Sequence, residues 1–263
     1  EENKLNFNKL EYFGDLSKRT ESLPFVTGDT FRIFADYVLD QVTTSLPKSI
    51  FTKQKPIIFV KTDYISKFFL DYFPKFSHKI ILITHNSDYA ITRNYIKYLD
   101  NQKLDVWFAQ NPEFLHPKLI PIPIGFINTH FNIEYLKLLK EYKDKTKPWN
   151  ERKIVMYVNF NEKTNKKSRS KYLNYFEKFQ GVKMNKKRIG FRAYFEDLNN
   201  SKFVLCPRGN GLDTHRFYES ILMGAIPIVA SSTLDSIYNK STTLILPSLE
   251  NLTEKMLKNP QNY

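Results

Sequence analysis

The chain has 263 residues, of which 41% are hydrophobic, 15% aromatic and 25% charged. These values are typical of a folded globular protein, so they exclude a disordered chain, and the length allows one large domain or two small ones. Lys and Arg outnumber Asp and Glu by 40 to 27, which gives a formal charge of +13 and predicts attraction to anions such as nucleotide sugars, acidic polysaccharide, nucleic acid or an anionic membrane surface.

Membrane and cysteine signals are weak. The chain contains no apolar run of about eighteen residues and its N-terminus, EENKLNFNKL, is too polar for a signal peptide, so we expect it to be soluble as given. The possibility that a leader or anchor before Glu1 has been removed stays open. Cys206 is the only cysteine, which favours a reducing compartment. We therefore expect the cytoplasm or a membrane surface, or the Golgi lumen if an anchor preceded Glu1.

Short apolar runs bounded by turn residues alternate with stretches of helical periodicity, which predicts an α/β fold with parallel strands. In the first half, apolar residues at spacings of three and four predict two crossover helices, at 63–72 and 88–99. The strands that we expect there lie at 56–60, 79–84, 106–109 and 119–124.

A charged segment at 143–153 contains Pro148, lacks an apolar face and marks the best domain boundary. We predict one α/β domain at 1–147 and a second at 148–263; the resemblance described below implies that the first is the acceptor side and that the second binds the nucleotide sugar. The strands expected in the second domain lie at 154–158, 203–205, 226–230 and 243–246, and its helices at 168–179, 191–199, 214–223, 233–238 and 249–257.

The segment from Cys206 to Val229, CPRGNGLDTHRFYESILMGAIPIV, places a glycine-rich loop between a strand and a helix. Backbone N–H groups at a helix N-terminus lack internal partners and carry partial positive charge, so this junction suits a phosphate. Gly209 and Gly211 permit close approach of the backbone. Arg208 and Arg216 supply fork-shaped donors for phosphate oxygens.

The helix after this loop has its own signals. Asp213 or Thr214 is the expected N-cap, which places Glu219 one turn beyond Arg216, where a carboxylate can accept from sugar hydroxyls. Gly224 suits the left-handed position after the helix. A structural alternative stays open, in which the glycines only turn the chain and the charged side chains cap the helix and pair with one another.

The whole segment resembles the C-terminal donor-binding region of exostosin-like glycosyltransferases, where a strand, a Cys/Pro-Arg-Gly loop, Ser/Thr-x-Arg-φ-x-Glu and a Met/Leu-Gly-x-Ile-Pro-Val turn follow in this order. The resemblance covers about Ser201 to Ala230 well. It implies a GT-B fold, with two Rossmann-like α/β domains facing a cleft, and an inverting, metal-independent sugar transfer. At 263 residues the chain is short for such an enzyme.

By the same resemblance, Arg208 and Arg216 bind the donor diphosphate and Glu219 accepts from a ribose or sugar hydroxyl. Asn159 and Arg169, which follow the first strand of the second domain, are expected to face the donor, although a solvated basic helix start is the alternative for both. The remaining expected donor-binding positions are Gly209, Asn210, Gly211, Asp213, Thr214 and His215.

No metal or other cofactor is expected. The chain lacks the Asp-x-Asp motif with which other glycosyltransferases hold a metal ion against the diphosphate, and its histidines have no metal-like spacing with Cys206.

An inverting transfer also needs a base to take the proton from the acceptor hydroxyl. His85 follows an apolar strand, has an unperturbed pKa near neutrality, and lies close in sequence to Asp88, which could orient it. Asp29 is a further candidate. The alternatives stay open that His85 is a core histidine and that Asp29 and Asp88 cap helices.

The leading hypothesis is therefore a hexosyl- or pentosyltransferase that moves a sugar from a nucleotide diphosphate, expected to be UDP, to a hydroxyl of a glycan or other acceptor. The charge and the aromatic content motivate a second hypothesis, a basic non-catalytic module that binds nucleic acid or acidic polysaccharide. No nucleic-acid motif occurs, so we expect no nucleic acid partner. A third hypothesis keeps the fold but makes the protein an epimerase or an inactive, donor-binding transferase.

Overall fold

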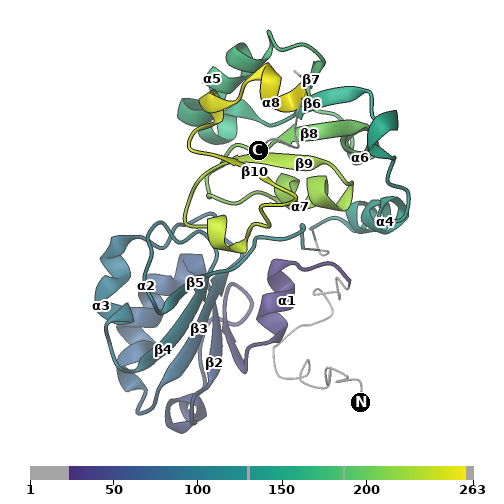
Figure 1. Cartoon of the computed structure of the whole chain (residues 1–263). Helices are drawn as coiled ribbons and strands as arrows, with labels where there is room; N and C mark the ends of the chain where they lie inside the picture. The colour runs from purple at the N-terminus through teal and green to yellow at the C-terminus, as the bar shows by residue number, and fades with distance from the viewer. Residues whose placement is uncertain (1–23, 129–130, 186, 259–263) are drawn as a thin grey trace. The chain divides into compact units, whose positions relative to one another are not determined.

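A computed structural model describes residues 24–128, 131–185 and 187–258 of the chain. The chain divides into two compact units, the first ending at Phe131 and the second beginning at Asn132. In Figure 1 the first unit runs from purple to blue and the second from teal to yellow. None of the helices in the described ranges combines the length and the apolar character that a membrane crossing requires.

The first unit is built on a five-stranded parallel sheet in the order β1-β2-β3-β4-β5. Because the spatial order equals the chain order, the strand order never reverses within this sheet. Its strands are β1 (Tyr37–Leu39), β2 (Ile57–Lys61), β3 (Ile80–His85), β4 (Leu104–Ala109) and β5 (Leu119–Pro121).

Alternate side chains of these strands enter two separate apolar clusters, as the period of two in a strand requires. Leu82 and Trp107 pack with Phe69 on one face, while Ile83 packs on the other face with Phe31. The helices of this unit are α1 (Gly28–Ile33), α2 (Ile65–Lys67) and α3 (Ile96–Leu99).

Of the two helices expected in this unit, the one at 63–72 is helical throughout, beginning with a 3-10 turn at Thr62–Tyr64, whereas the one at 88–99 is shorter in the structure. After α2 the chain continues as a π-helical turn, Phe68–Tyr72. Before α3, the backbone of Ile91 is engaged elsewhere, because its N–H donates to the carbonyl of Asn111 and its carbonyl accepts from Glu113. These contacts keep residue 91 outside a helix.

The second unit contains another parallel sheet of five strands, in the order β10-β9-β8-β6-β7. The chain steps from β6 outward to β7 and then returns to β8 on the other side of β6. This reversal is the topological switch point of Rossmann-like sheets. The strands are β6 (Ile154–Val158), β7 (Val182–Met184), β8 (Ser201–Leu205), β9 (Ile226–Ala230) and β10 (Leu244–Leu246).

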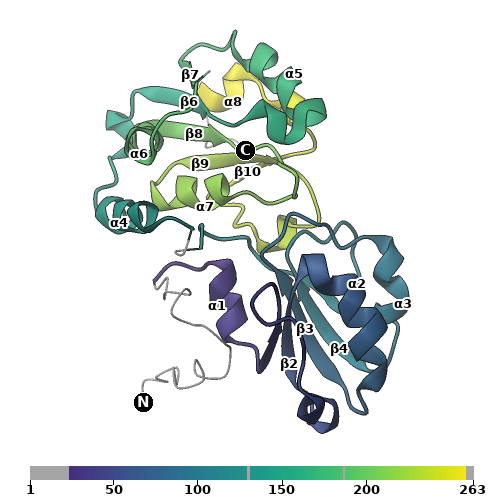
Figure 2. The ribbon, with the colours of Figure 1, turned by 180° about the vertical axis from the view of Figure 1, so that it is seen from behind.

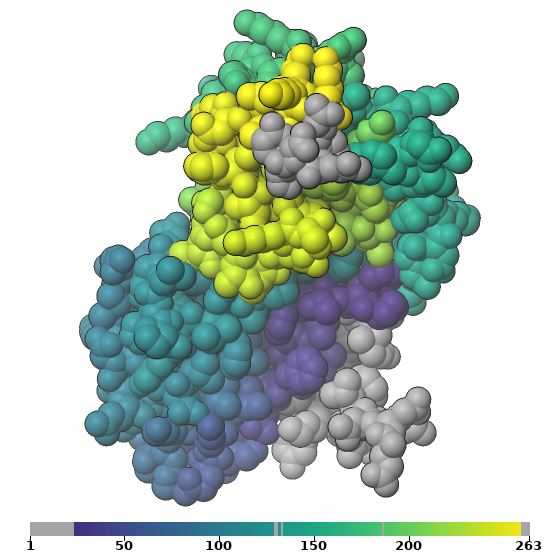
Figure 3. Space-filling view, in the orientation of Figure 1, coloured from purple at the N-terminus to yellow at the C-terminus, as the bar shows by residue number. Residues whose placement is uncertain are grey.

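Helices cover both faces of this sheet (Figures 1 and 2). Met156 and Phe203 pack with Phe176 and Leu257, on the face of α5 and α8, whereas Tyr157 points the other way and contacts Tyr194 of α6. The C-terminal segment with α8 lies on the outside of the unit, in yellow in Figure 3. The helices are α4 (Ile133–Tyr142), α5 (Lys166–Phe176), α6 (Phe191–Asn199), α7 (His215–Leu222) and α8 (Glu254–Lys258).

The predicted α/β class with two Rossmann-like sheets is thus confirmed. The division between the units falls after Phe131, earlier than the boundary predicted after residue 147. The reason is α4, whose Tyr135 packs against Phe191 and Phe195 of α6 and is fully buried there. The helix therefore belongs to the second unit, although the charged segment follows it.

A buried arginine ties the amino ends of the second sheet together. Arg152 is 5% exposed, and its guanidinium donates to the carbonyls of Lys147, Ser201 and Met223 at 2.7 to 3.0 Å. Burial lowers its pKa. Gly224 follows with φ +69, as predicted, and a Cβ there would lie 2.7 Å from the Arg152 guanidinium, so only glycine fits.

Candidate functional site

The carboxyl ends of β6 and β8 meet at the switch point of the second sheet, where ligands of such sheets bind. Strand β8 leads through the glycine-rich loop to α7, with Thr214 as N-cap in an extended conformation. The predicted strand, loop and helix are therefore all present. The loop after β6, which starts at Asn159, lies at the same edge.

Arg169 lies beneath the glycine-rich loop. It is 5% exposed and donates from Nε to the carbonyl of Arg208 at 2.9 Å, from Nη1 to that of Asn161 at 3.0 Å and from Nη2 to that of Pro207 at 3.2 Å. A Cβ on Gly209 would come within 3.1 Å of Nη2. The sequence predicted Arg169 as a donor ligand, but its guanidinium is turned to the backbone of the loops.

Asn165 is a site residue that the sequence analysis missed. Its side-chain oxygen accepts from the N–H of Ser168 at 3.2 Å and so caps α5, while its Nδ2 donates to the carbonyl of Gly209 at 2.8 Å. An Asn three residues before Ser168 is a recognisable N-cap signal. Its second bond joins α5 to a loop that is 44 residues away in sequence.

Arg216, in the first turn of α7, carries a buried Nε that has no hydrogen-bond partner among the described residues. Burial, and then the charge of Arg216, lower the pKa of Arg169 to about 10, so the two guanidinium groups are close enough to interact. An unsatisfied buried donor costs about 1–3 kcal/mol, and a second cation nearby adds repulsion. An anion would relieve both.

The other loop residues divide by exposure. Arg208 and Asn210 are exposed, and Arg208 donates from Nη2 to the carbonyl of Asn210 at 3.2 Å. Gly209 and Gly211 are buried, and Thr214 and His215 are half-buried at the start of α7. Asn159 is half-buried and donates to the Tyr157 hydroxyl at 2.8 Å, next to the switch point.

Glu219 does not have the surroundings that the sequence predicted. It is 4% exposed, and its two carboxylate oxygens accept from the hydroxyls of Tyr135 and Tyr194, each at 2.6 Å. Burial and the neighbouring carboxylate raise the pKa of Tyr194. Both oxygens are bound inside the unit, so acceptance from a sugar hydroxyl by Glu219 would need one tyrosine bond to be exchanged, and this role stays a prediction.

Asp213 is engaged in the same way. It is 4% exposed and accepts from the Tyr218 hydroxyl at 2.6 Å, the Tyr238 hydroxyl at 3.2 Å and the N–H of Thr214 at 2.9 Å. The carboxylate therefore fixes the start of α7, and its predicted place beside the donor sugar stays a prediction. The tyrosines come from positions that the sequence gave no reason to connect with Asp213.

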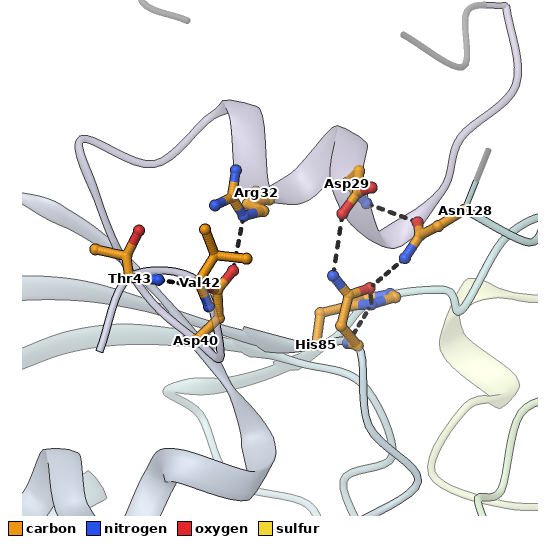
Figure 4. Close-up of polar contacts among 8 residues, drawn as sticks. Asp29, Arg32, Asp40, Val42, Thr43, His85 and Asn128 are labelled. Atoms are coloured by element: carbon orange, nitrogen blue, oxygen red, sulfur yellow. Dashed lines mark hydrogen bonds and ion pairs between the residues drawn. The ribbon is translucent and has the colours of Figure 1, made fainter. Parts of the chain in front are cut away.

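A second polar cluster lies at the carboxyl end of β3 in the first unit (Figure 4). The Asn128 side chain accepts from the N–H of Asp29 at 3.0 Å and donates to the Asn86 side chain at 3.0 Å, which in turn donates to the Asp29 carboxylate at 3.2 Å. Three segments far apart in sequence thus meet here. A Cβ on Gly28 would lie 1.8 Å from Asn86 Oδ1, so glycine is required.

His85 is part of this cluster and is 2% exposed. Its Nε2 lies 3.0 Å from the carbonyl of Pro123, which can only accept, so Nε2 carries the proton. Its Nδ1 accepts from the N–H of Asn86 at 2.7 Å, and its ring stacks on Phe31. Both ring nitrogens are therefore engaged, which favours the alternative of a core histidine, and the role of His85 as a base stays a prediction. Asp88, expected to orient it, is exposed.

Arg32 and Asp40 form a buried ion pair at 2.9 Å beside the cluster (Figure 4). Asp40 also accepts from the N–H groups of Val42 and Thr43. Burial alone would raise the pKa of Asp40, but the Thr43 N–H and the Arg32 charge outweigh it, and the pKa is lowered. The pair fixes α1 against the end of β1.

Gln110 lies next to His85 in the sheet register, because Thr84 pairs with Ala109. It is 2% exposed, and its Oε1 is buried with no hydrogen-bond partner among the described residues. A buried amide oxygen without a donor suits a hydroxyl group. Sequence reasoning missed this residue, although a polar Gln directly after an apolar strand is a usable signal.

Within the described ranges, no group of three or more His, Cys, Asp and Glu side chains has the arrangement of a metal site. Cys206 is buried, and burial raises the pKa of its thiol to about 12. The thiol is therefore a packing group and not a nucleophile.

Comparison with known proteins identifies the domain. No curated protein sequence matches the chain. Residues 125–250 match the family model of the Exostosin GT47 domain, and they include the whole second sheet, both loops at its switch point and Asn128 of the first unit. The resemblance seen in the sequence is thereby confirmed. The chain carries an exostosin-family (GT47) glycosyltransferase domain over residues 125–250.

Proposed function

We propose that this domain transfers a sugar from a nucleoside diphosphate donor to a hydroxyl group, with the diphosphate at the switch point of the second sheet. The observation that carries the proposal is the buried Arg216 Nε, which has no hydrogen-bond partner among the described residues, on a side chain whose charge also acts on Arg169. Buried donors are normally satisfied, and a charged one left open at a strand end calls for an anion. A diphosphate leaving group supplies it.

The loop residues have distinct proposed roles. Arg208 is exposed at the loop and Arg216 lies at the helix start, so together they offer donors to both phosphates. The exposed Asn210, the backbone of Gly211 and the half-buried His215 line the donor side. These interactions strengthen as negative charge moves onto the leaving diphosphate, which is the step that needs stabilisation.

The hydroxyl side is proposed for the first unit. Gln110 Oε1 is suited to accept from a hydroxyl, and Asp29 is the proposed base. The Asp29 carboxylate accepts from Asn86 at 3.2 Å in the cluster at the carboxyl end of β3. The transfer is proposed to be inverting and metal-independent, with a UDP-linked donor and a glycan or other hydroxyl as acceptor.

The experiment is a release assay. The protein is incubated with UDP-, GDP- and CMP-sugars, with and without a panel of oligosaccharide acceptors, and free nucleotide is measured. We expect one nucleoside diphosphate sugar to release its nucleotide faster with an acceptor present. Absence of both binding and release across all the donors would refute the proposal.

A binding module without catalysis remains the competing function, because the formal charge is +13. It predicts salt-sensitive binding to acidic polysaccharide with no effect of nucleotide sugars. Competition between a nucleoside diphosphate and heparin-like polysaccharide separates the two functions. We expect the nucleotide to bind at a site that the polysaccharide does not block.

A further inference from the structure

Two loops at the switch point are held by side chains that bind their carbonyl groups. Arg169 binds the carbonyls of Pro207 and Arg208, and Asn165 binds the carbonyl of Gly209. Three consecutive carbonyls of the glycine-rich loop are therefore fixed by side chains of α5 and its cap. The third Arg169 bond, to the carbonyl of Asn161, ties the loop after β6 to the same guanidinium.

The direction of these carbonyls sets the direction of the N–H groups. In a trans peptide the carbonyl of one residue and the N–H of the next point in opposite directions. The N–H groups of Arg208, Gly209 and Asn210 are therefore directed away from α5. Successive N–H groups on one side of a loop form a concave site for anions.

The side away from α5 is also the open side of the loop. Arg169 is 5% exposed, whereas the side chains of Arg208 and Asn210 are exposed. Gly209 lies against the guanidinium, since a Cβ there would come within 3.1 Å of Arg169 Nη2. The contact of loop and guanidinium is therefore tight at this position.

We propose that Arg169 is a positioning residue that holds the glycine-rich loop with its N–H groups turned toward the donor diphosphate, and that Asn165 assists it. This inference rests on the proposed function of the loop. Arg169 acts through the backbone and touches no phosphate, in contrast to Arg208 and Arg216.

Arg152 provides a matched control in the same unit. It is equally buried, also 5% exposed, and it too donates to backbone carbonyls, but at the amino ends of the strands. Replacing either arginine by Lys keeps the charge and removes the fork. Both replacements should lower the thermal unfolding temperature. A loss of ligand affinity in the Arg169 variant alone therefore reports on the loop and not on overall stability.

The experiment titrates wild type, Arg169→Lys, Arg169→Gln and Arg152→Lys with inorganic pyrophosphate and with UDP, well below each unfolding temperature. We expect both Arg169 variants to lose at least about tenfold in affinity for both probes, and Arg152→Lys to bind as wild type does. The Lys and Gln variants should lose affinity equally, because a direct phosphate contact is not what is removed.

Asn165→Ser gives an independent test that does not depend on Arg169 variants folding. Ser retains the N-cap of α5 but has no amide to hold the Gly209 carbonyl. We expect a loss of a few fold in pyrophosphate affinity with an unfolding temperature close to that of wild type.

Several results would overturn the inference. Wild-type affinity in Arg169→Lys with a loss only in Arg169→Gln would make Arg169 a direct charge ligand. Equal losses in Arg169→Lys and Arg152→Lys would make the effect general destabilisation. If wild type binds neither pyrophosphate nor any nucleoside diphosphate, the proposed function fails and this inference with it, whereas wild-type binding with unaffected variants sinks the inference alone.

Discussion

The carboxyl edges of the two sheets both bury polar side chains, but they differ in which atoms lack a hydrogen-bond partner among the described residues. In the second unit a charged donor, Nε of Arg216, has no hydrogen-bond partner among the described residues, and Arg216 interacts electrostatically with Arg169. In the first unit Asn86, His85 and their partners bond one another, and the neutral acceptor Oε1 of Gln110 has no partner among the described residues. One edge suits an anion and the other suits a hydroxyl.

The comparison teaches that a buried polar residue at a strand end does not by itself mark a site. His85, Glu219 and Asp213 are all buried and all satisfied by neighbours, so they support the fold. The informative feature is the chemistry of what is left unsatisfied. Each of the following predictions tests this contrast between the two edges.

The largest effect on turnover is expected in the polar cluster at the carboxyl end of β3, on the proposed hydroxyl side. Asp29→Asn should lower kcat by about 100- to 10,000-fold with unchanged donor affinity, because the amide cannot take a proton. His85→Gln should destabilise the fold while the properly folded fraction keeps its turnover. Steady-state kinetics, with the folded fraction measured by donor titration, checks both variants. If His85→Gln lost turnover and Asp29→Asn kept it, His85 would be the base.

Breaking the buried ion pair Arg32–Asp40 tests how far the stability of the first unit depends on polar groups that satisfy one another. Asp40→Asn should cost about 3–5 kcal/mol of unfolding free energy at neutral pH, since it leaves Arg32 without its counter-charge. The pKa of Asp40 is lowered in the folded state, so its contribution is present above the unfolded pKa and is lost as pH falls through the folded pKa.

Urea unfolding of wild type and Asp40→Asn from pH 7 to pH 2 measures this dependence. The difference between the two proteins should shrink steadily below about pH 4, where the unfolded carboxyl begins to protonate. A difference that is independent of pH would show that the ion pair is not its source.

Replacing Arg216, the donor of the second unit that has no partner among the described residues, should change ligand affinity and protein stability in opposite directions. Arg216→Met should weaken binding of nucleoside diphosphates by about 10- to 100-fold, because it removes charge-assisted hydrogen bonds. It should also raise the stability of the ligand-free protein, since an unsatisfied buried donor disappears. Calorimetric titration and thermal unfolding test the two parts, and unchanged affinity would rule out Arg216 as a ligand.

A smaller effect of the same kind is expected at Gln110. Gln110→Leu should raise the KM for the acceptor a few fold and stabilise the ligand-free fold by about 1 kcal/mol, with no change in donor affinity. Acceptor and donor titrations in parallel separate the two sides. A loss of donor affinity would contradict the division of roles between the edges.

The smallest effect is expected from chelation. EDTA should leave turnover unchanged, because arginines and backbone N–H groups are proposed to carry the leaving-group charge. Activity is measured before and after dialysis against the chelator. Loss of activity that Mn²⁺ restores would contradict the metal-independent mechanism.

Much of the fold was predictable because it depends on local pattern. The apolar runs predicted β2, β3, β4, β6, β8 and β9, and the glycine-rich segment predicted a loop between β8 and α7. Strands β1 and β7 were missed, since each has three residues and β7 is not fully buried at any position. The helix expected at 88–99 was overestimated, because backbone pairing of Ile91 overrides its periodicity.

The site was predictable only in part, because its decisive contacts are long-range. Its charge and its position in the sequence made Arg169 a candidate. They did not predict that its partners are carbonyls 38 and 39 residues away. Glu219 was predicted to be available, and its tyrosine partners lie 84 and 25 residues away on other helices. Local sequence shows which groups are present, whereas tertiary packing decides which of them remain open.

The central claim is that the donor diphosphate binds at the switch point of the second sheet and satisfies Arg216. The most direct measurement is a crystal structure of the protein with UDP bound. It should show a phosphate oxygen within hydrogen-bond distance of Arg216 Nε, with the N–H groups of the glycine-rich loop facing the diphosphate. A nucleotide bound elsewhere, with Arg216 Nε still unpartnered, would contradict the account.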